Sequence, residues 1–420
     1  MVLIAMIAVF PIDRSRSSDR VDPTTLHGKM IMGYQGWFSC PGDAAGRGWV
    51  HWKAAQKDVT VEMLPDVSEL APSERCDSGL VARNGKPVEF FSDMNPQTVD
   101  RQFGWMQTYG IDGVALQRFA SVLLHPEIEK ASDAVLGNVR ESAEKHGRVF
   151  FLMYDLSSMP AAKLDLIVED WRKWVAQGLT KSSAYLHHKG RPVLGIWGVG
   201  LKGHDLTPEQ FEALMTQLRA VDGAAGVTVL GGVPVWWREG GGGVSPDPGW
   251  RRVWPKLDVI SPWTVGFYKD DAGADNYRRR FLEPDLAAAK KMGVDYMPVV
   301  FPGFSWSNLM RVRNNLEKAI PNQIPRRCGA LYWRQVVNAI DAGATMLYTA
   351  MFDEVDEGTA MFKLDVSASN SPEKPSFLTL DADGCPVSSD WYLRLGGAAQ
   401  AAFAKRPGWS AFPLKTPDSH

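Results

Sequence analysis

The chain has 420 residues, of which 45% are hydrophobic and 22% are charged, and its formal net charge at pH 7 is -2. This composition is typical of a folded globular protein and excludes a largely disordered or fibrous chain. Because the chain is nearly neutral and contains no Lys/Arg-rich block, it lacks the electrostatic footprint of a nucleic-acid-binding protein. We therefore expect no nucleic-acid partner.

The two ends of the chain differ in composition from the rest. Residues 1–10 are apolar but too few to span a bilayer, and no other run reaches transmembrane length. They fit the hydrophobic part of a signal peptide or a first strand, although a basic start and an A-x-A cleavage site are missing. We assign residues 1–20 to a signal or linker segment, 21–405 to one barrel domain and 406–420 to a tail. No integral membrane segment is expected.

The four cysteines are Cys40, Cys76, Cys328 and Cys385. Their spacings match neither a zinc site nor a CxxC redox motif. Cys40 and Cys76 fall in one long loop region and can pair if the protein is exported; otherwise all four are expected to be free buried thiols. A periplasmic or secreted location is favoured over a cytoplasmic one.

Taken in chain order, eight short apolar runs alternate with amphipathic stretches whose apolar residues recur at helical spacing. The runs cover residues 29–38, 113–119, 149–155, 192–199, 226–237, 258–263, 295–301 and 345–352. Helices are expected over residues 96–109, 127–146, 160–177, 208–221, 250–255, 275–292, 329–342 and 389–405. A loop-rich insertion separates the first run from the first of these helices.

Continuous apolar strands of this kind are buried on both faces, as the strands of parallel sheets are. Eight strand–helix units is the number that closes a (β/α)₈ barrel, so we predict an α/β fold: a single-domain TIM barrel with long βα loops. The alternative is an open doubly wound sheet. No G-x-G-x-x-G follows the first strand, so the nucleotide site usual in such a sheet is missing.

The active site of a (β/α)₈ barrel lies at the C-terminal ends of its strands. The side chains expected there, as substrate-binding candidates, are Tyr34, Gln35, Trp37, Gln117, Arg118, Tyr154, Asp155, Trp197, Trp236, Trp237, Trp263, Trp306 and Asp353. Six of the 16 tryptophans of the chain are in this set. Aromatic rings mixed with hydrogen-bonding groups suit a hydroxyl-rich ligand such as a sugar. For any single tryptophan, packing as a lid over the barrel is an equal alternative. His51, in the first long loop, is a further candidate for the pocket.

The segment FDEVDEGT, residues 352–359, directly follows the eighth run. Glu354 and Glu357 are three residues apart, so a turn would direct both side chains into one space. Two neighbouring carboxylates cannot both ionise easily, which separates an acid from a base, as glycoside hydrolysis requires. A solvated acidic turn or a calcium loop is the alternative, but the spacing and the glycine position of an EF-hand loop are absent.

The run YTAMFDEVDEGT resembles the strand-8 motif of glycoside hydrolase families 99 and 71, roughly F-N-E-W-x-E-G-T. GYQGWFSCPGD, GIDGVALQRF, FPGFSWSNL and IPRRCGALYWRQ resemble a family 71/99-like branch over most of residues 27–400. Family 99 comprises endo-α-mannosidases and endo-α-mannanases. The resemblance implies an α-glycan substrate, an oligo- or polysaccharide, and retention through a 1,2-anhydro sugar, with no cofactor and no metal.

By position, the resemblance implies that Glu354 is the base that deprotonates the sugar 2-hydroxyl. It implies that Glu357 is the acid that protonates the leaving oxygen and later activates water. The sequence departs from the family pattern at Asp353, where the family has Asn, and at Val355, where it has Trp. Arg327, with Arg326 beside it, precedes a helix and is a candidate to reach a sugar hydroxyl or an anionic substituent.

Two other functions remain open at this point. The two departures favour a non-catalytic carbohydrate-binding barrel as the main alternative to an enzyme. A barrel enzyme in which Glu354 removes a proton next to a carbonyl is a third reading.

Overall fold

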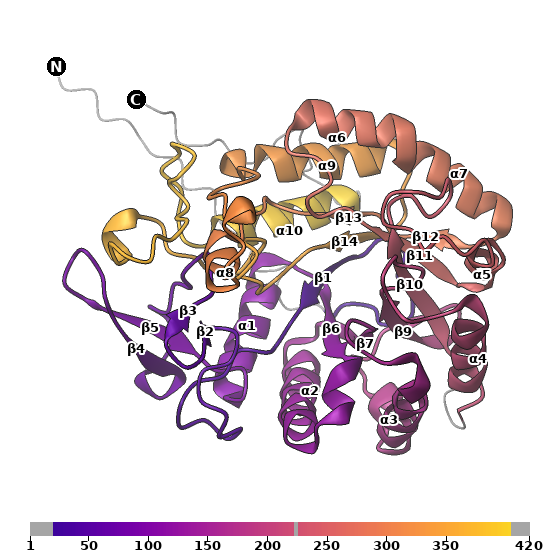
Figure 1. Cartoon of the computed structure of the whole chain (residues 1–420), viewed down its shortest axis with the longest axis horizontal. Helices are drawn as coiled ribbons and strands as arrows, with labels where there is room; N and C mark the ends of the chain where they lie inside the picture. The colour runs from indigo at the N-terminus through magenta and orange to yellow at the C-terminus, as the bar shows by residue number, and fades with distance from the viewer. Residues whose placement is uncertain (1–19, 222–225, 405–420) are drawn as a thin grey trace.

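The computed structural model describes residues 20–221 and 226–404. Residues 1–19 of the expected signal or linker segment and the expected tail from residue 406 lie outside the described residues. Figure 1 shows a central sheet with helices packed around it and additional loops beside β1. No helix among the described residues is long and apolar enough to cross a membrane.

The central sheet is built from the predicted apolar runs. Its strands are β1 (Met30–Tyr34), β6 (Gly113–Phe119), β7 (Val149–Asp155), β9 (Arg191–Trp197), β10 (Thr228–Pro234), β11 (Val259–Trp263), β12 (Asp295–Tyr296), β13 (Val299–Val300) and β14 (Leu347–Thr349). They pair in parallel in the order β12-β11-β10-β9-β7-β6-β1-β14-β13. The short strand β8 (His187–His188) is added antiparallel to β9.

The sheet curls until its two ends meet in one segment of chain. β12 and β13 are two parts of one strand, separated only by Met297 and Pro298. The strand is interrupted there because proline has no N–H to donate to a neighbouring strand. Met297 N donates to Ile260 O of β11 at 2.9 Å, and Tyr348 N of β14 donates to the Pro298 oxygen at 2.9 Å. The predicted α/β barrel architecture, with eight strand segments, is confirmed.

The helices follow the strands in sequence and cover the outside of the sheet (Figure 1). They are α1 (Pro96–Tyr109), α2 (Pro126–His146), α3 (Asp165–Ala176), α4 (Pro208–Arg219), α5 (Trp250–Val253), α6 (Asp271–Tyr277), α7 (Glu283–Met292), α8 (Ser307–Val312), α9 (Ala330–Asp341) and α10 (Trp391–Phe403). A π-helical turn at Arg278–Leu282 joins α6 to α7. Helix α1 has the predicted bounds because Asn95 accepts from Gln97 N at its start and Gly110, with φ 74°, ends it.

Short 3₁₀ turns complete the helical elements. They lie at Pro72–Glu74, Ala120–Leu124, Ala161–Lys163, Leu179–Lys181, Trp254–Lys256, Leu316–Lys318, Arg327–Gly329 and Ala368–Asn370. The insertion after β1 contains two hairpins, β2 (Lys53–Ala54) with β3 (Asp58–Val59) and β4 (Arg75–Val81) with β5 (Pro87–Phe91).

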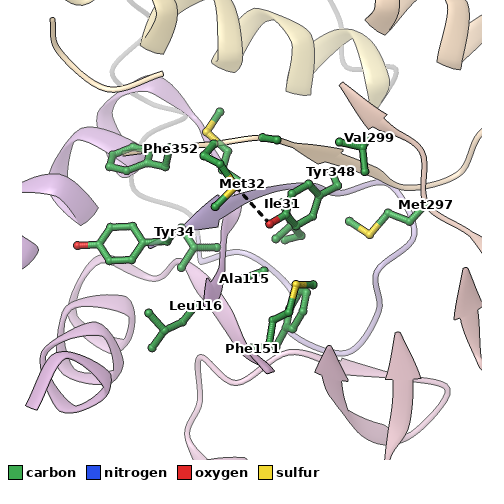
Figure 2. Close-up of a cluster of buried hydrophobic side chains, with 14 of the residues drawn as sticks. Ile31, Met32, Tyr34, Ala115, Leu116, Phe151, Met297, Val299, Tyr348 and Phe352 are labelled. Carbon is green, nitrogen blue, oxygen red and sulfur yellow. Dashed lines mark hydrogen bonds between the residues drawn. The ribbon is translucent and has the colours of Figure 1, made fainter. Parts of the chain in front are cut away.

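Apolar side chains from neighbouring strands fill the inside of the sheet. Figure 2 shows Ile31, Ala115, Phe151 and Tyr348 in one such cluster, drawn from β1, β6, β7 and β14. All four are at most 2% exposed. Burying a large apolar side chain stabilises a fold by about 1.5–3 kcal/mol. This packed interior leaves only the rim at the strand ends for a ligand.

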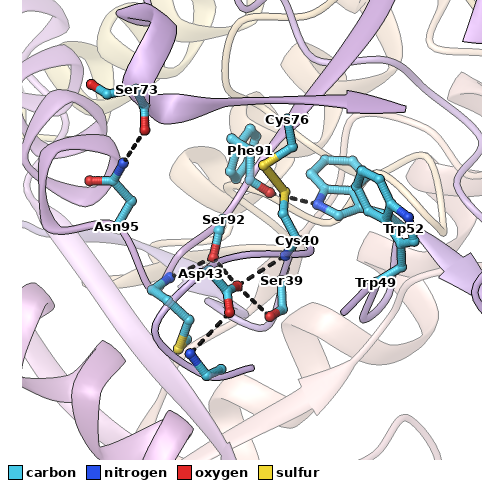
Figure 3. Close-up of a disulfide and its surroundings, with 12 residues drawn as sticks. Ser39, Cys40, Asp43, Trp49, Trp52, Ser73, Cys76, Phe91, Ser92 and Asn95 are labelled. Carbon is cyan, nitrogen blue, oxygen red and sulfur yellow. Dashed lines mark hydrogen bonds between the residues drawn. A yellow bond between two sulfur atoms is a disulfide. The ribbon is translucent and has the colours of Figure 1, made fainter. Parts of the chain in front are cut away.

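All four cysteines are in disulfides, Cys40–Cys76 and Cys328–Cys385. The first bond is the pairing that the sequence left open, and the alternative of four free thiols is wrong. This bond joins the loop after β1 to β4 beside the ring of Trp52 (Figure 3). The second, which the sequence did not predict, ties the start of α9 to the loop before α10. Disulfides persist mainly in oxidising compartments, so the pair is typical of a protein that works outside the cytoplasm.

Candidate active site

A cavity of about 700 Å³ lies where the strands of the sheet end. Its floor and walls near the strand ends are formed by Gln35, Trp37, Gln117, Phe119, Asp155, Trp197, Trp263, Met351, Glu354, Asp356 and Glu357. Loops contribute the remaining wall, chiefly Arg47, Trp49, His51, Lys53, Gln56, Thr60, Leu309, Val312 and Arg313. The size and the mixture of aromatic and polar groups fit a small-molecule or oligosaccharide site.

The acidic segment after β14 is fixed by backbone hydrogen bonds to two long loops. Val355 O accepts from Glu62 N at 2.9 Å and from Met63 N at 3.2 Å. Ser305 N donates to Glu357 O at 2.9 Å. The loops after β1 and β13 therefore hold the segment from either side, and both glutamates face the cavity from one short turn.

A buried arginine holds the end of the same turn. Arg326, 4% exposed, donates to Gly358 O at 2.9 Å and to Ala360 O at 2.7 Å. Its guanidinium also lies 4.4 Å from the ring centroid of Tyr392. Gly358 has φ 64°, and a Cβ there would meet the Ser305 backbone at 3.0 Å, so both the conformation and the space favour glycine. Arg326 therefore positions the turn and does not reach the cavity.

Glu354 is buried at the base of the cavity, 5% exposed. Gln35 Nε2 donates to its Oε1 at 3.0 Å, and Thr359 Oγ1 donates to its Oε2 at 3.2 Å. Burial raises the pKa of Glu354 well above its usual value, and the negative charges of Glu357, Asp356 and Asp353 add to the rise. The two donors favour the ionised form, in which the carboxylate can act as a base.

Glu357 is partly exposed to the cavity. Burial, together with the charge of Asp356, raises the pKa of Glu357 to about 7, while Arg313 opposes the rise. A carboxyl group with this pKa carries a proton for part of the time at neutral pH. Such a group can give a proton to a leaving oxygen and later take one from water.

Asp353 is fully buried and does not line the cavity. Its carboxylate accepts from Gln35 N at 2.8 Å and from Gly36 N at 2.9 Å, which fixes the chain where it leaves β1. Burial raises the pKa of Asp353 to about 7. Asp353 therefore positions Gln35, which in turn donates to Glu354.

The aromatic lining offers flat faces for a ligand. The rings of Trp37 and His51 stack with centroids 3.7 Å apart, and Trp197 meets Trp263 edge-on at 5.7 Å. His51 Nδ1 lies 3.5 Å from Asp356 Oδ2.

Several polar atoms in the lining have no protein partner. Among the described residues, Gln35 Oε1, Trp37 Nε1 and Asp356 Oδ1 are buried without a protein hydrogen bond. Buried polar atoms are normally paired, so these three are unusual features of the residues around the cavity.

The structure brings part of the predicted set together. Gln35, Trp37, Gln117, Asp155, Trp197 and Trp263 line the cavity with Glu354 and Glu357, as does His51. That these side chains bind substrate stays a prediction.

The other candidates do not line this cavity, and their predicted placement is corrected. Tyr34, Arg118 and Tyr154 point outward to the helices. Tyr34 donates to Gln102, Arg118 donates to Asp170 and Asp133, and Tyr154 donates to Asp170. Successive side chains of a strand alternate between faces, so Gln117 faces inward and Arg118 cannot.

Corrections also apply to candidates beyond the strands. Trp237 donates to Asp285 of α7, and Trp236 packs edge-on against Phe281. Trp306 lies against Phe304, with 5.1 Å between ring centroids. Arg327 is exposed and pairs with Asp271 at 2.8 Å.

Sequence reasoning missed the cavity residues that loops supply. Arg47, Lys53 and Gln56 lie in the insertion after β1, and Arg313 lies at the end of α8. No motif marks them, because loops carry no periodic signal that predicts which side chains face a cavity. The general rule that βα loops build the sites of barrel enzymes predicts that loop residues contribute, but it does not indicate which ones.

Two groups of residues elsewhere have spacing that suits a metal ion, His27, His188 and Asp295, and Glu129, Asp133 and Asp170. In the first, His188 Nε2 faces Asp295 at 2.8 Å while its Nδ1 accepts from Leu26 N at 3.2 Å, so both ring nitrogens are engaged. In the second, Arg118 and Lys173 already neutralise the carboxylates. Both groups are therefore ion-pair or hydrogen-bond networks.

No protein-family model and no curated protein matches the sequence. Among solved structures, the fold is similar to that of the GH99 endo-α-mannosidase from Bacteroides thetaiotaomicron. In its complex with bis-tris propane the TM-score is 0.64 at 14% identity, covering 91% of this chain and 99% of that chain. A second structure of that enzyme gives a TM-score of 0.63.

A third structure, described as a glycoside hydrolase-like protein, has a TM-score of 0.54 at 12% identity over 94% of this chain and 97% of its own. At these identities the likeness shows the fold. The chain has a glycoside hydrolase-like fold that resembles family 99, and the resemblance predicted from the strand-8 motif is confirmed at that level.

Proposed function

We propose that the protein is a retaining glycoside hydrolase that cleaves an α-linked glycan with Glu354 and Glu357. The observation that carries the proposal is that both carboxyl groups face one aromatic-lined cavity from a single turn after β14. The raised pKa of each, caused first by burial, supports an acid and a base at this place. The glycoside hydrolase-like fold supports it independently.

In the proposed reaction Glu354 takes the proton of the sugar 2-hydroxyl, whose oxygen attacks C1. Glu357 gives its proton to the leaving oxygen as the glycosidic bond breaks, and a 1,2-anhydro sugar results. Water then opens this ring at C1: Glu357 takes a proton from the water, and Glu354 returns its proton to the 2-oxygen. Two inversions at C1 give net retention.

This route restricts the substrate. The attacking 2-oxygen and the leaving group must lie on opposite faces of the sugar, as they do in an α-mannoside but not in an α-glucoside. We therefore expect a manno-configured sugar at the cleaved bond. The two disulfides support a location in the periplasm or outside the cell.

The test is hydrolysis of a panel of α-glycans by the wild type and two variants, followed by chromatography of released oligosaccharides. Glu354→Gln should abolish cleavage of every substrate, because the proposed route needs Glu354 to deprotonate the 2-hydroxyl. Glu357→Gln should slow the cleavage of natural glycans at least a hundredfold. The variant should retain more activity on an aryl glycoside, whose leaving group needs no proton. Wild-type rates for both variants would refute the assignment.

A non-catalytic carbohydrate-binding barrel is the second candidate, favoured by the buried carboxylate of Asp353 where the family has Asn. It predicts binding to α-glycans by calorimetry with no release of reducing ends by the wild type.

A further inference from the structure

The cavity contains cationic side chains that form no ion pair with its carboxylates, although the charge of Arg313 acts on Glu357 from a distance. Arg47, Lys53 and Arg313 line its loop wall. Within the part of the chain that the structure describes, the guanidinium groups of Arg47 and Arg313 are in no side-chain hydrogen bond and no ion pair. Arginines elsewhere are commonly held by carboxylates, for example in the pairs Arg101–Glu74, Arg238–Asp285 and Arg334–Asp275.

The three cations lie on neighbouring elements of one side of the cavity. Lys53 belongs to β2, which pairs with β3. β3 packs against α8, and Arg313 directly follows that helix. Arg47 lies in the same loop region as Lys53, on the stretch that also lines a smaller adjoining pocket with Trp37 and His51. Lys53 itself is engaged, since it donates to Ser78 O and lies 4.6 Å from the Trp49 ring centroid. The two arginines are therefore the groups available to a ligand.

Four acidic side chains line the cavity, Asp155, Glu354, Asp356 and Glu357, but together they carry less than four negative charges near neutral pH. Burial is the main cause that raises the pKa of Asp155, Glu354 and Glu357, so these groups carry protons more readily than free carboxyls. The arginines keep their full charge at any pH at which the protein is folded. Near neutral pH the loop wall therefore presents positive charge to a ligand.

A neutral sugar does not account for two unpaired guanidinium groups at the wall. Its hydroxyl groups could accept hydrogen bonds from the two arginines but would supply no opposite charge. An oxyanion would match the fork of N–H donors on each arginine and form charge-assisted hydrogen bonds. The neutral parts of a glycan can contact Gln35, Trp37 and Gln117, which line the same cavity.

We infer that the ligand of this cavity is an α-glycan that carries anionic substituents, as carboxylate, sulfate ester or phosphate ester groups. Arg47 and Arg313 bind these groups on the loop wall while the glycosidic bond lies over Glu354 and Glu357. The inference deepens the proposed function and rests on it for cleavage, but the binding that it predicts is measurable without cleavage.

The experiment measures binding of the full chain to matched polysaccharides by calorimetry at low salt. The probe is an α-mannan, used unmodified, chemically sulfated, phosphorylated, or oxidised to the uronate. The sulfated, phosphorylated and oxidised arms distinguish which anion is preferred. We expect at least one anionic form to bind about tenfold or more tightly than its neutral parent, with an affinity that falls as salt rises.

Three variants locate the site. Arg47→Gln and Arg313→Gln should each weaken binding of the anionic form about tenfold and leave binding of the neutral parent nearly unchanged. Arg313→Lys should retain part of the preference because it keeps the charge. Arg251→Gln is the matched control, since Arg251 is an exposed arginine of α5 away from the cavity lining.

Equal binding of anionic and neutral forms would overturn the inference. So would a preference for anions that neither Arg47→Gln nor Arg313→Gln reduces, because the anion would then bind elsewhere. Failure of the proposed function gives a different result: tight, arginine-dependent binding of an anionic glycan with no cleavage by the wild type.

Discussion

At the scale of single residues, the acid–base assignment makes a prediction about pH. Glu357 must be protonated to act as the acid, and its pKa is raised to about 7, so kcat/KM should fall as pH rises through about 7. Glu354 must be ionised, and its pKa is also raised, so the acid limb should lie above the usual glutamate value. The pair therefore holds one proton in its active form. A pH–rate profile on one glycan measures both limbs.

Asp353→Asn tests whether the charge of Asp353 affects the acid limb of that profile. The change removes the negative charge of Asp353 beside Glu354. An amide oxygen at the Oδ2 position can still accept from Gln35 N and Gly36 N, which lie at 3.1 and 2.9 Å. The amide nitrogen then stands where Oδ1 now accepts from Gln35 N at 2.8 Å, so that hydrogen bond is lost. The pKa of Glu354 should fall, and the acid limb should move to lower pH with the alkaline limb nearly unchanged. An acid limb that stays in place would contradict the electrostatic coupling of Asp353 to Glu354.

The sequence predicted some of these residues and not others for a definite reason. Gln117 and Asp155 face the cavity, whereas Arg118 and Tyr154, their neighbours in the chain, face the helices. Both members of each pair lie at a strand end, so position alone could not separate them. Their orientation depends on the register of the curled sheet, which apolar runs buried on both faces do not reveal.

At the scale of elements, the site depends on a contact between two long loops. Glu62, in the insertion after β1, is 3% exposed and accepts from Ser305 Oγ at 2.7 Å and Asn308 N at 2.9 Å. Asn308 belongs to α8, which also carries Leu309 and ends beside Arg313. The Glu62 carboxylate therefore joins the insertion after β1 to the loop after β13, and the backbone N–H groups of Glu62 and Ser305 join both to the acidic turn.

Glu62→Ala should loosen this wall. The change leaves the Ser305 hydroxyl and the Asn308 N–H without their acceptor, at a cost of about 2–4 kcal/mol in the free energy of unfolding. Because Ser305 N also donates to Glu357 O, and Leu309 of α8 lines the cavity, KM should rise severalfold. Denaturant unfolding and steady-state kinetics measure the two effects.

Glu141→Ala is the control for this prediction, since Glu141 is an exposed glutamate of α2. It should change stability by less than about 0.5 kcal/mol. Equal effects of the two substitutions would show that the Glu62 contacts do not stabilise the loop wall.

The sequence specified regular elements better than it specified these loops. Helix α1 matches its prediction because a cap, an amphipathic pattern and a C-terminal glycine agree. The predicted helix over residues 275–292 instead begins at Asp271, where Asp270 caps it, and includes a π-helical turn. The hairpins of the insertion were not predicted. The strands β2 and β3 have only two residues each, which is too short to show alternation. The strands β4 and β5 are longer, at seven and five residues, but a bulge between Asp77 and Leu80 interrupts their register.

At the scale of the whole molecule, the two disulfides connect distant parts of the chain. They close loops of 36 and 57 residues, and loops of these lengths correspond to about 4 kcal/mol each in the chain-entropy account. The Cys40–Cys76 bond adjoins the loop that supplies Arg47 and His51 to the cavity. The Cys328–Cys385 bond lies between α9 and α10, away from the cavity lining.

Replacing each pair of cysteines by serine should therefore have different consequences. Both double variants should unfold at a Tm lower by about 5 °C or more, because each frees a loop in the unfolded chain. Cys40→Ser with Cys76→Ser should also raise KM severalfold, since the loop wall becomes less ordered. Cys328→Ser with Cys385→Ser should leave KM unchanged, which makes it the control for stability loss alone. If the KM values of the two double variants rise together, loss of stability and not disorder of the loop wall explains the effect.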